Sequence, residues 1–303
     1  MKNSSIGIAI LTYNSAHHLP FCLPPLEGFK VLIVDPQSTD ETITLAKKMG
    51  AEVLEIPYEE FNHGLTREKA RIHLGTDIVV FMTPDAYGIA GFVQKLVEPI
   101  VKQEADLAYA RQLPKEGASY FESMPRQLNY SGTSHIRSWE DKKQWGSFLF
   151  FCSDSCSAYS NKALNQIGGF SECLLGEDAL ACAKILKGGG KIAYVAEAEV
   201  FHSHTYTLLQ EFRRYFDTGL ARKALAPFLE EVGTDSQYGK HFTKQFLSHI
   251  PMHLIPYGIA HLGIKWLGYH VGKYLGPHLP KAMKKKLSSQ KYYWDSVYTK
   301  RNK

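Results

Sequence analysis

Cysteine is scarce in this sequence, and its spacing matches no common metal or disulfide pattern. The 303 residues include five cysteines, and no two of them are spaced as CxxC. Such scattered thiols argue against a structural zinc site or a disulfide framework and are typical of a reducing compartment. We therefore expect a cytoplasmic protein.

Long hydrophobic runs are missing too. No stretch of about eighteen uninterrupted apolar residues occurs, so the sequence predicts no membrane-spanning helix. The first apolar run, residues 6–12, has neither a basic leader nor a small-residue cleavage site beside it. We therefore expect no secretory signal peptide.

The sequence also lacks the glycine-rich loops of common nucleotide-binding folds. No GxGxxG motif follows residues 6–12, which disfavours a dinucleotide-binding Rossmann domain. A first loop rich in glycine and bearing lysine or arginine, as a nucleotidyltransferase would need for a triphosphate, is absent as well. A bound nucleotide would therefore be held mainly by side chains.

The composition is that of a folded, slightly basic protein. Apolar residues make up 44% of the chain and charged residues 21%, enough for one large core or for one core with an appendage. The net charge of +5 is uneven, because residues 242–303 are rich in lysine, histidine and aromatics and poor in acids. We expect this end to meet an anionic surface, and we expect no nucleic-acid partner.

Strand and helix patterns alternate through the first part of the chain. Strands are expected at residues 6–12, 30–35, 52–56 and 77–82, and helices at 41–49 and 66–74. Ser38 to Glu41 has the spacing of a capping box for the first helix. This alternation predicts an α/β fold with a mainly parallel sheet flanked by helices.

The pattern is less regular from about residue 105 onward. The polar and aromatic stretch 105–145 is interpreted as a long functional loop region, because it is neither Gly/Ser-rich nor highly charged. The remaining expected elements are a strand within 148–159, helices at 162–167 and 177–186, and extended segments at 191–195 and 199–204.

Asp85 stands directly after the most strand-like run of the chain. Residues 78–82 are apolar on both faces, as in a strand buried within a parallel sheet. Pro84 ends the run and places Asp85 just beyond its carboxyl end, the edge at which open α/β sheets bind ligands. The alternative is an ordinary turn in which Asp85 caps the next helix.

Seven short motifs occur in a defined order along the chain. They are Leu-Thr-Tyr-Asn at 11–14, Val-Asp-Pro-Gln-Ser-Thr-Asp at 34–40, Asn-His-Gly-Leu-Thr-Arg at 62–67, Thr-Pro-Asp-Ala at 83–86, Gly-Gly-Phe at 168–170, Gly-Glu-Asp at 176–178 and His-Ser-His at 202–204. Their order resembles that of inverting family 2 glycosyltransferases of the GT-A (nucleotide-diphospho-sugar transferase) fold. Within that family the chain is most similar to bacterial rhamnosyltransferases of surface-polysaccharide biosynthesis, and the resemblance covers nearly the whole chain.

The resemblance implies a divalent cation, Mn²⁺ or Mg²⁺, at Asp85. This position belongs to a DxD-like motif in which Thr83 replaces the first acid, so the departure puts strict metal dependence in question. His202 and His204 are two residues apart, so on a strand both rings leave the same face and could complete the metal or diphosphate site. The alternative is one ring in the core and the other in solvent.

The same resemblance assigns the catalytic carboxylates. An inverting transfer needs a base that takes the proton of the acceptor hydroxyl, and we assign this role to Asp178, with Glu177 orienting the acceptor or the base. Without the resemblance, two acids in a first helical turn would be read as favourable partners of the helix dipole.

Further residues are expected to bind the donor or the acceptor. Arg67 is suited to bidentate contact with phosphate, although an exposed helical arginine is the alternative. Asp35 is expected at the nucleobase or ribose, with Pro36 where many relatives carry a second acid. The donor-binding set is Thr12, Tyr13, Asp35, Arg67, Asp85 and Arg111, and the acceptor-binding set is Gln112, Ser153 and Asp154.

The sequence thus predicts a catalytic domain at residues 1–225 and a helical region at 226–303. The second region is expected to lie at the inner face of the cell membrane, to build a homo-oligomer, or both. The expected donor is dTDP-L-rhamnose and the expected acceptor a lipid-linked glycan. The alternatives are a UDP-hexose donor, or a non-catalytic scaffold of a polysaccharide-assembly complex.

Overall fold

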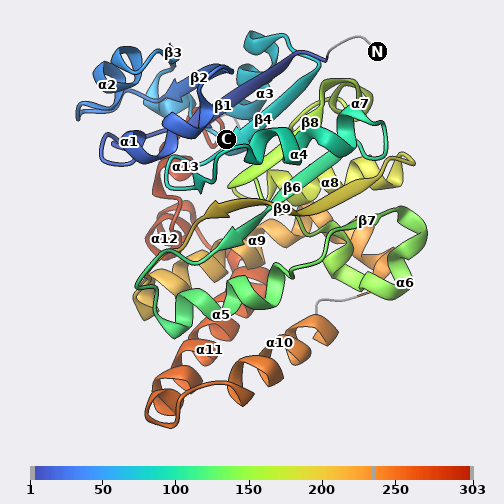
Figure 1. The fold of residues 1–303 in the computed structure, drawn as a ribbon. Helices are drawn as coiled ribbons and strands as arrows, with labels where there is room; N and C mark the ends of the chain where they lie inside the picture. The colour runs from blue at the N-terminus through green and yellow to red at the C-terminus, as the bar shows by residue number, and fades with distance from the viewer. Residues whose placement is uncertain (1–3, 234–235, 301–303) are drawn as a thin grey trace.

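The computed structural model describes residues 4–233 and 236–300, and its centre is a nine-stranded mixed sheet. Figure 1 shows helices on both sides of the sheet and a group of C-terminal helices below it. The strand order is β3-β2-β1-β4-β8-β6-β9-β5, and β7 pairs with β9 outside this path.

The first four strands are parallel, as the sequence predicts. They pair in the order β3-β2-β1-β4 with helices in the connections between them. The elements of this half are β1 (Ile6–Leu11), α1 (Leu19–Cys22), β2 (Lys30–Asp35), α2 (Thr42–Lys48), β3 (Glu52–Glu55), α3 (His63–Leu74), β4 (Ile78–Met82), β5 (Tyr87–Gly88) and α4 (Phe92–Val101).

The capping box expected between Ser38 and Glu41 is not formed. Ser38 instead turns back to the end of β2, where its backbone N–H and its hydroxyl donate to Asp35 at 2.6 and 2.7 Å. Helix α2 begins at Thr42, whose N–H donates to Asp40 at 3.0 Å. The Ser38 hydroxyl also accepts a hydrogen bond from the backbone N–H of Asn14 at 2.7 Å, so contacts with the ends of β1 and β2 have replaced the cap.

The second half of the sheet contains antiparallel strands. Strand β8 is antiparallel to both β4 and β6, whereas β9 is parallel to β6. The strand expected within 148–159 begins only at Cys156, because residues 146–150 form a 3-10 helix, and the two segments expected at 191–204 form one strand. The strands are β6 (Leu107–Leu113), β7 (His135–Arg137), β8 (Cys156–Ser160) and β9 (Ile192–Phe201).

The prediction of a long loop at residues 105–145 is wrong. This stretch contains β6, β7 and two helices, α5 (Tyr120–Asn129) and α6 (Lys142–Trp145). Helix α5 is stable there because Met124 packs against Phe246 and Ile250 from the far end of the chain. Those partners are more than a hundred residues away, so the local sequence gave no sign of the helix.

Two hydrophobic cores lie on opposite faces of the sheet. Alternate residues of β4 serve both, with Val80 in the core that α4 covers and Phe81 in the core that includes residues of α3 and α8. All five residues of β4 are buried, as expected for a central strand. The remaining helices of the catalytic part are α7 (Asn161–Gln166) and α8 (Glu177–Lys187).

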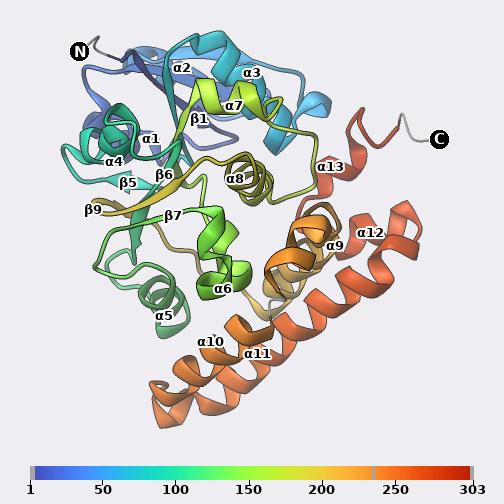
Figure 2. The same ribbon diagram turned by 90° about the vertical axis from the view of Figure 1, so that its right-hand side faces the viewer.

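A group of helices follows β9 and lies beside the catalytic part (Figure 2). The first of them spans residues 208–232 and so crosses the domain boundary expected at residue 225. No helix among the described residues is long and apolar enough to cross a membrane. The elements are α9 (Leu208–Val232), α10 (Ser236–Ser248), α11 (Ile255–His270), a π-helical turn (Val271–Leu275), α12 (Lys281–Leu287) and α13 (Lys291–Asp295).

Helices α9 and α11 pack through a glycine seam. A β-carbon added to Gly268 would lie 2.5 Å from the Phe212 carbonyl oxygen, and one added to Gly272 would lie 2.0 Å from that of Phe216. Neither position can hold a larger residue without moving the helices apart. The backbones of α9 and α11 therefore lie closer together than ordinary side chains would allow.

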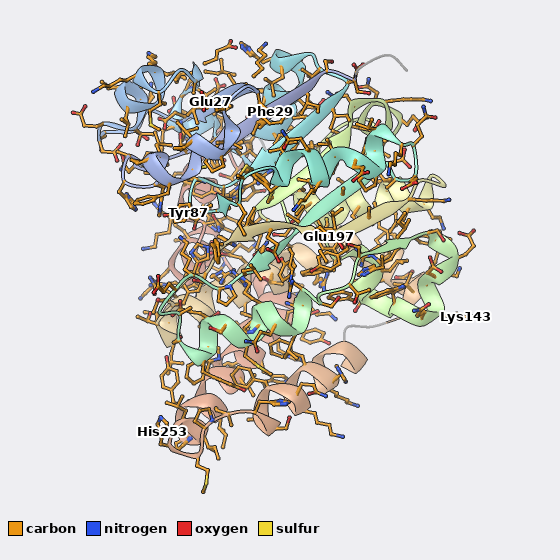
Figure 3. The ribbon with its side chains drawn as sticks, in the orientation of Figure 1. Glu27, Phe29, Tyr87, Lys143, Glu197 and His253 are labelled. Carbon is orange, nitrogen blue, oxygen red and sulfur yellow. The ribbon has the colours of Figure 1, made fainter. Side chains whose placement is uncertain are left out.

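The side of α11 that faces α9 is polar, and its other side is apolar. Glu211 of α9 pairs with His261 at 3.2 Å and with Lys265 at 3.3 Å. Ile259 and Leu267 lie outside this contact and are 60% and 44% exposed. Figure 3 labels His253, just before α11, at the lower tip of the molecule, far from the sheet. The helix thus presents apolar side chains to the outside at that end.

Candidate active site

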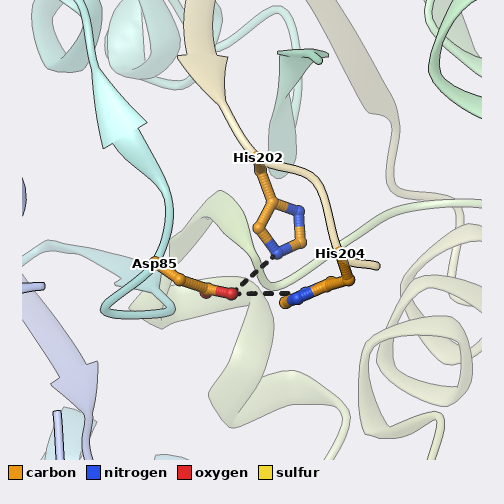
Figure 4. Close-up of side chains that lie close together, drawn as sticks. All are labelled: Asp85, His202 and His204. Carbon is orange, nitrogen blue, oxygen red and sulfur yellow. Dashed lines mark ion pairs between the residues drawn. The ribbon is translucent and has the colours of Figure 1, made fainter. Parts of the chain in front are cut away.

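Asp85, His202 and His204 meet at the carboxyl ends of two strands (Figure 4). Asp85 follows β4, and the two histidines follow β9. Oδ2 of Asp85 lies 3.5 Å from Nε2 of His202 and 3.3 Å from Nε2 of His204. One ligand atom from each residue lies within 4.8 Å of the other two. Both rings reach the same carboxylate, which excludes the alternative of one ring in the core and the other in solvent.

His202 is fixed from behind by polar contacts. Its Nδ1 donates to the Gln112 amide oxygen at 2.8 Å, and the Arg126 Nε donates to its carbonyl oxygen at 2.9 Å. Nη2 of Arg126 lies 3.4 Å from Nδ1, but the contact of Nδ1 with Gln112 is shorter, so we assign the hydrogen bond to Gln112. With a proton on Nδ1, the Nε2 atom that faces Asp85 can donate to this carboxylate when the ring is charged, or offer its lone pair to a cation when the ring is neutral.

The electrostatics of the three residues suit a bound cation. Burial alone would raise the pKa of Asp85, but hydrogen bonding to His202 and the neighbouring imidazoles hold it well below its usual range. Burial lowers the pKa of His202, and burial together with His202 lowers the pKa of His204 to about 4. An ionised carboxylate and two neutral imidazoles form a ligand set for a divalent ion.

Gln112 connects this cluster to a second group of acids. While its amide oxygen holds His202, its amide nitrogen donates to Ser153 Oγ at 2.9 Å. The next residue, Asp154, has its backbone N–H 3.4 Å from Oδ2 of Asp178. A chain of contacts through Gln112 and Ser153 therefore runs from the histidines to Asp178.

The second group is built around Arg67 of α3. This side chain is 4% exposed, so it is not the surface arginine of the alternative interpretation. Its Nε lies 2.8 Å from Asp154, and its NH1 lies 2.7 Å from Glu177. The other oxygen of Asp154 accepts hydrogen bonds from Ser157 and Tyr159 at 2.6 and 2.7 Å. The guanidinium is thus held between two buried carboxylates.

Asp178 forms no ion pair with any residue that the structure describes, and it is half-buried at the first turn of α8. Burial, followed by the negative charges of Glu177 and Asp154, raises the pKa of Asp178 to about 8. Burial also works against charge on Glu177, but Arg67 outweighs it and lowers the pKa of Glu177. Asp178 is therefore the carboxyl group of this cluster best able to accept a proton near neutral pH.

The first motifs of the chain lie at the ends of β1 and β2. Asp35 is 0% exposed, and Thr12 donates to it at 2.7 Å beside the two bonds from Ser38. Tyr13 is 46% exposed, and its ring centroid lies 5.3 Å from that of Tyr58. Asp35 thus holds the shape of this edge, and its predicted contact with a nucleobase or ribose stays a prediction.

Most predicted site residues come together, and Arg111 does not. Its NH1 pairs with Glu199 of β9 at 3.1 Å, and it neighbours Gln112 on β6, so the two side chains leave opposite faces of the strand. The predicted donor contact of Arg111 stays a prediction. The residues joined by the contacts above are Asp85, His202, His204, Gln112, Ser153, Asp154, Asp178, Arg67 and Glu177.

Three basic residues near the site were missed by sequence reasoning. Arg126 of α5 holds His202, His18 pairs with the Tyr87 hydroxyl at 2.7 Å, and the Lys115 Nζ lies 4.1 Å from the centre of the Tyr87 ring. The charges of His18 and Lys115 both interact with Asp85. Nothing in the spacing of these residues signals their position, because only the packing of distant elements brings them there.

Comparison with known proteins gives a consistent result. A model described as glycosyl transferase family 2 matches residues 8–168. The chain is 33% identical to the O-antigen chain rhamnosyltransferase RfbN of Salmonella typhimurium, with 96% of both chains covered. It is 35% identical to the O-antigen chain rhamnosyltransferase WbaN of Salmonella anatum, over 88% of this chain and 87% of that protein.

Solved structures show the same fold at low sequence identity. Residues 1–349 of TarS from S. aureus, in complex with UDP-GlcNAc, superpose with a TM-score of 0.55 at 16% identity, covering 99% of this chain and 92% of that one. The mannosyltransferase PcManGT from Pyrobaculum calidifontis, in complex with GDP-Man and Mn²⁺, gives 0.58 at 14% identity, covering 98% and 86%.

Proposed function

Because the chain belongs to glycosyltransferase family 2 and has the GT-A type of fold, we propose that it transfers L-rhamnose from dTDP-L-rhamnose, with inversion, to a lipid-linked glycan. The choice of rhamnose is supported by the two Salmonella relatives, which are named as O-antigen chain rhamnosyltransferases and match most of the chain. A lipid-linked acceptor fits the assembly of such a surface polysaccharide.

One observation supports this proposal more than any other. The Asp85–His202–His204 cluster and the half-buried Asp178 belong to one connected site, joined through Gln112, Ser153 and the backbone of Asp154. An inverting transfer needs both a group that stabilises the leaving diphosphate and a base for the acceptor hydroxyl. The two clusters are assigned to these two tasks.

On the donor side, Asp85, His202 and His204 would hold Mn²⁺ or Mg²⁺. The bound cation would supply neutralisation of the charge that develops on the departing nucleoside diphosphate. Gln112 and Arg126 keep the His202 ring in place, so that Nε2 faces Asp85. Lys115 and His18 add basic groups beside Asp85 and are suited to the same diphosphate.

Tyr13, with Tyr58 beside it, offers an exposed aromatic face at the end of β1, which suits a nucleobase. Thr12 and Asp35 hold the backbone of this edge in shape. The four side chains are proposed to form the nucleoside end of the donor pocket, with the diphosphate pointing toward Asp85.

On the acceptor side, Asp178 is proposed to remove the proton of the attacking hydroxyl. Glu177 is engaged by Arg67 and is therefore assigned a positioning role, in which its charge also keeps the pKa of Asp178 high. The two ion pairs of Arg67 support a positioning role for this residue, beside the phosphate contact predicted for it. Ser153 and the backbone of Asp154 connect Gln112 to Asp178 and so hold the acceptor side in place relative to the histidines.

The C-terminal region, residues 226–303, is proposed to rest on the inner face of the cell membrane, next to a lipid-linked acceptor. Exposed apolar side chains of α11 support this, since Ile259 and Leu267 are well exposed while the polar side of the helix is buried. The last turn of α12 adds Lys284, Lys285 and Lys286, which suit anionic headgroups.

Donor competition tests the proposal. The protein is incubated with Mn²⁺, a lipid-linked glycan acceptor, and one of dTDP-L-rhamnose, UDP-glucose, UDP-galactose or UDP-N-acetylglucosamine, and release of the nucleoside diphosphate is measured. Release from dTDP-L-rhamnose above all others is expected, together with the opposite anomeric configuration in the product. Preference for a UDP-sugar would rule out dTDP-L-rhamnose as the donor. A lack of release from every donor would rule out the proposed transferase activity.

A further inference from the structure

A cavity of about 1330 Å³ lies between α9, α10 and α11, outside the Asp85 and Asp178 clusters. Pockets for compact small molecules usually measure about 300–1,000 Å³. In Figure 2 the three helices run below the catalytic part. A cavity of this size has room for an elongated ligand.

The walls of the cavity combine hydrocarbon and aromatic surface with basic side chains. Trp266 and Tyr274, both well exposed, are among its aromatic residues, and Glu230 is the one acid among the described residues that line it. The basic residues on its walls are Arg222, Lys223, Lys240, Lys244, Lys265 and Lys273. Such a surface suits an amphiphile with a strongly anionic head and an apolar chain.

The cavity is connected to the active site through α5. Pro125 and Asn129 of this helix line the cavity, whereas Arg126 between them donates to the carbonyl oxygen of His202. An α-helix with its side chains is about 10–12 Å wide, so a ligand in the cavity lies roughly one helix away from the histidine. Helix α9 makes a second link, because it begins at Leu208 after His204 and contributes Tyr215 to the cavity.

We propose that this cavity binds the diphosphate and the adjoining hydrocarbon chain of the lipid-linked acceptor. The inference rests on the proposed function, to which it adds a separate place for the lipid end of the substrate. A diphosphate matches several lysines at once, and a prenyl chain matches the apolar and aromatic wall. A free nucleotide or inorganic phosphate would leave that wall without a partner.

Calorimetric titration with three probes tests the proposal on the whole protein. The probes are a fifteen-carbon prenyl diphosphate, the prenyl alcohol of the same length, and inorganic diphosphate, all in metal-free buffer so that no cation at Asp85 holds a diphosphate. The prenyl diphosphate is expected to bind at least about tenfold more tightly than either partial probe, since each of these lacks one half of the recognition. Equal affinity for prenyl diphosphate and inorganic diphosphate would overturn the proposal, as would equal affinity for the alcohol.

Variants locate the binding site. The double substitution Lys244→Gln/Lys273→Gln removes two cavity charges, and Ala226→Trp fills the cavity from α9. Each is expected to weaken prenyl diphosphate binding about tenfold or more, whereas Lys48→Gln/Lys162→Gln, at exposed lysines outside the cavity, leaves binding unchanged. Unchanged binding in both cavity variants would overturn the proposal, and so would complete displacement of the probe by vesicles of an anionic phospholipid.

Turnover separates this inference from the proposed function. The cavity variants are expected to transfer sugar to a glycan without lipid at the wild-type rate and to lose about tenfold in kcat/KM on the lipid-linked glycan. If the wild-type protein transfers no sugar to either acceptor, the proposed function fails while the prenyl diphosphate titration still reports on the cavity. If transfer occurs and the cavity variants lose the same factor on both acceptors, the cavity assignment fails alone.

Discussion

Gln112 accepts a hydrogen bond from Nδ1 of His202 over 2.8 Å, and the same amide donates to Ser153 at 2.9 Å. Gln112 lies on β6, His202 lies just beyond the end of the neighbouring strand β9, and both are buried. Outer residues of this kind orient a metal-binding imidazole and set which ring nitrogen is free. The function of Gln112 in this arrangement can be tested apart from the ligands themselves.

Gln112→Leu is expected to weaken Mn²⁺ binding by about 10–100-fold, because His202 loses the acceptor that fixes its ring. Gln112→Glu keeps an acceptor for Nδ1 and should retain most of the affinity. The measurement is calorimetric titration of Mn²⁺, with Gln144→Leu on the exposed side of α6 as the control. Equal affinity in Gln112→Leu and wild type would contradict a supporting role for this residue.

The pH profile of the reaction reports on Asp178. A base with a pKa of about 8 must lose its proton to act, so kcat/KM should rise about tenfold per pH unit up to that value and then level off. Glu177→Gln removes a negative charge beside Asp178, so it should lower the pKa of Asp178 and move the rising limb of the kcat/KM profile to lower pH. Asp178→Asn should abolish transfer and leave donor binding intact.

Glu172→Gln, at an exposed acid that precedes α8, serves as the control for this profile and should leave the limb in place. If the rise of kcat/KM stays at the same pH in Glu177→Gln, Asp178 is not the group whose titration the profile reports.

Arg67→Met should destabilise the protein strongly, because it leaves Asp154 and Glu177 buried without their cation. The loss of one partner from a buried ion pair costs about 3–5 kcal/mol. Lys69→Met is the matched control, since Lys69 pairs with Glu60 at 2.8 Å while 43% of its side chain is exposed. Such a surface pair contributes at most about 1 kcal/mol. Urea unfolding measures both, and similar losses would show that burial is not decisive here.

Ile259→Glu/Leu267→Glu should reduce binding to vesicles that contain anionic lipid by about tenfold or more. Both side chains are well exposed on α11, and burying one aliphatic side chain of this size contributes about 1.5–3 kcal/mol. Ile72→Glu on α3, where the side chain is 64% exposed, is the control. If cosedimentation is unchanged but analytical ultracentrifugation shows a dimer becoming a monomer, the apolar face serves self-association.

Gly272→Ala should destabilise the packing of α9 against α11 by about 1–3 kcal/mol, because the new methyl group meets the Phe216 carbonyl oxygen. Gly263→Ala, within α11 and ahead of the π-helical turn that holds Gly272, meets no atom within 4 Å and should be neutral or stabilising by up to about 1 kcal/mol. Thermal unfolding of the two variants tests the seam. A stable Gly272→Ala protein would mean that the helices can separate without cost.

Local patterns in the sequence were sufficient for the first half of the fold. The four parallel strands follow from short apolar runs that end at turn residues, and the place of Asp85 follows from the end of one such run. The capping box at Ser38 and the loop at 105–145 failed for a common reason: the deciding contacts, Ser38 with the backbone of Asn14 and Met124 with Phe246, join residues far apart in the chain. A local pattern cannot represent them.

Some site residues, such as Glu177 and Asp178, were predicted only from the family resemblance, because composition and periodicity do not indicate them. The resemblance did not supply their contacts. The ion pairs of Arg67 and the bridge through Gln112 depend on how α3, α8 and β6 approach one another, and no spacing in the sequence encodes that approach. The basic residues of α5 and of the loop after β6 were missed for the same reason.

The close packing of α9 against α11 and the turn after it would have a geometric consequence if the protein rests on a membrane as proposed. Helix α9 begins at Leu208, soon after His202 and His204, and its backbone contacts the π-helical turn that follows α11 with no side chain between them at Gly272. A bilayer that holds the outer side of α11 would thus hold the reaction centre at a fixed height, without a hinge. Only acceptor sugars at a matching distance from the lipid surface would then reach Asp178, so a rigid seam would limit how long the growing glycan can be.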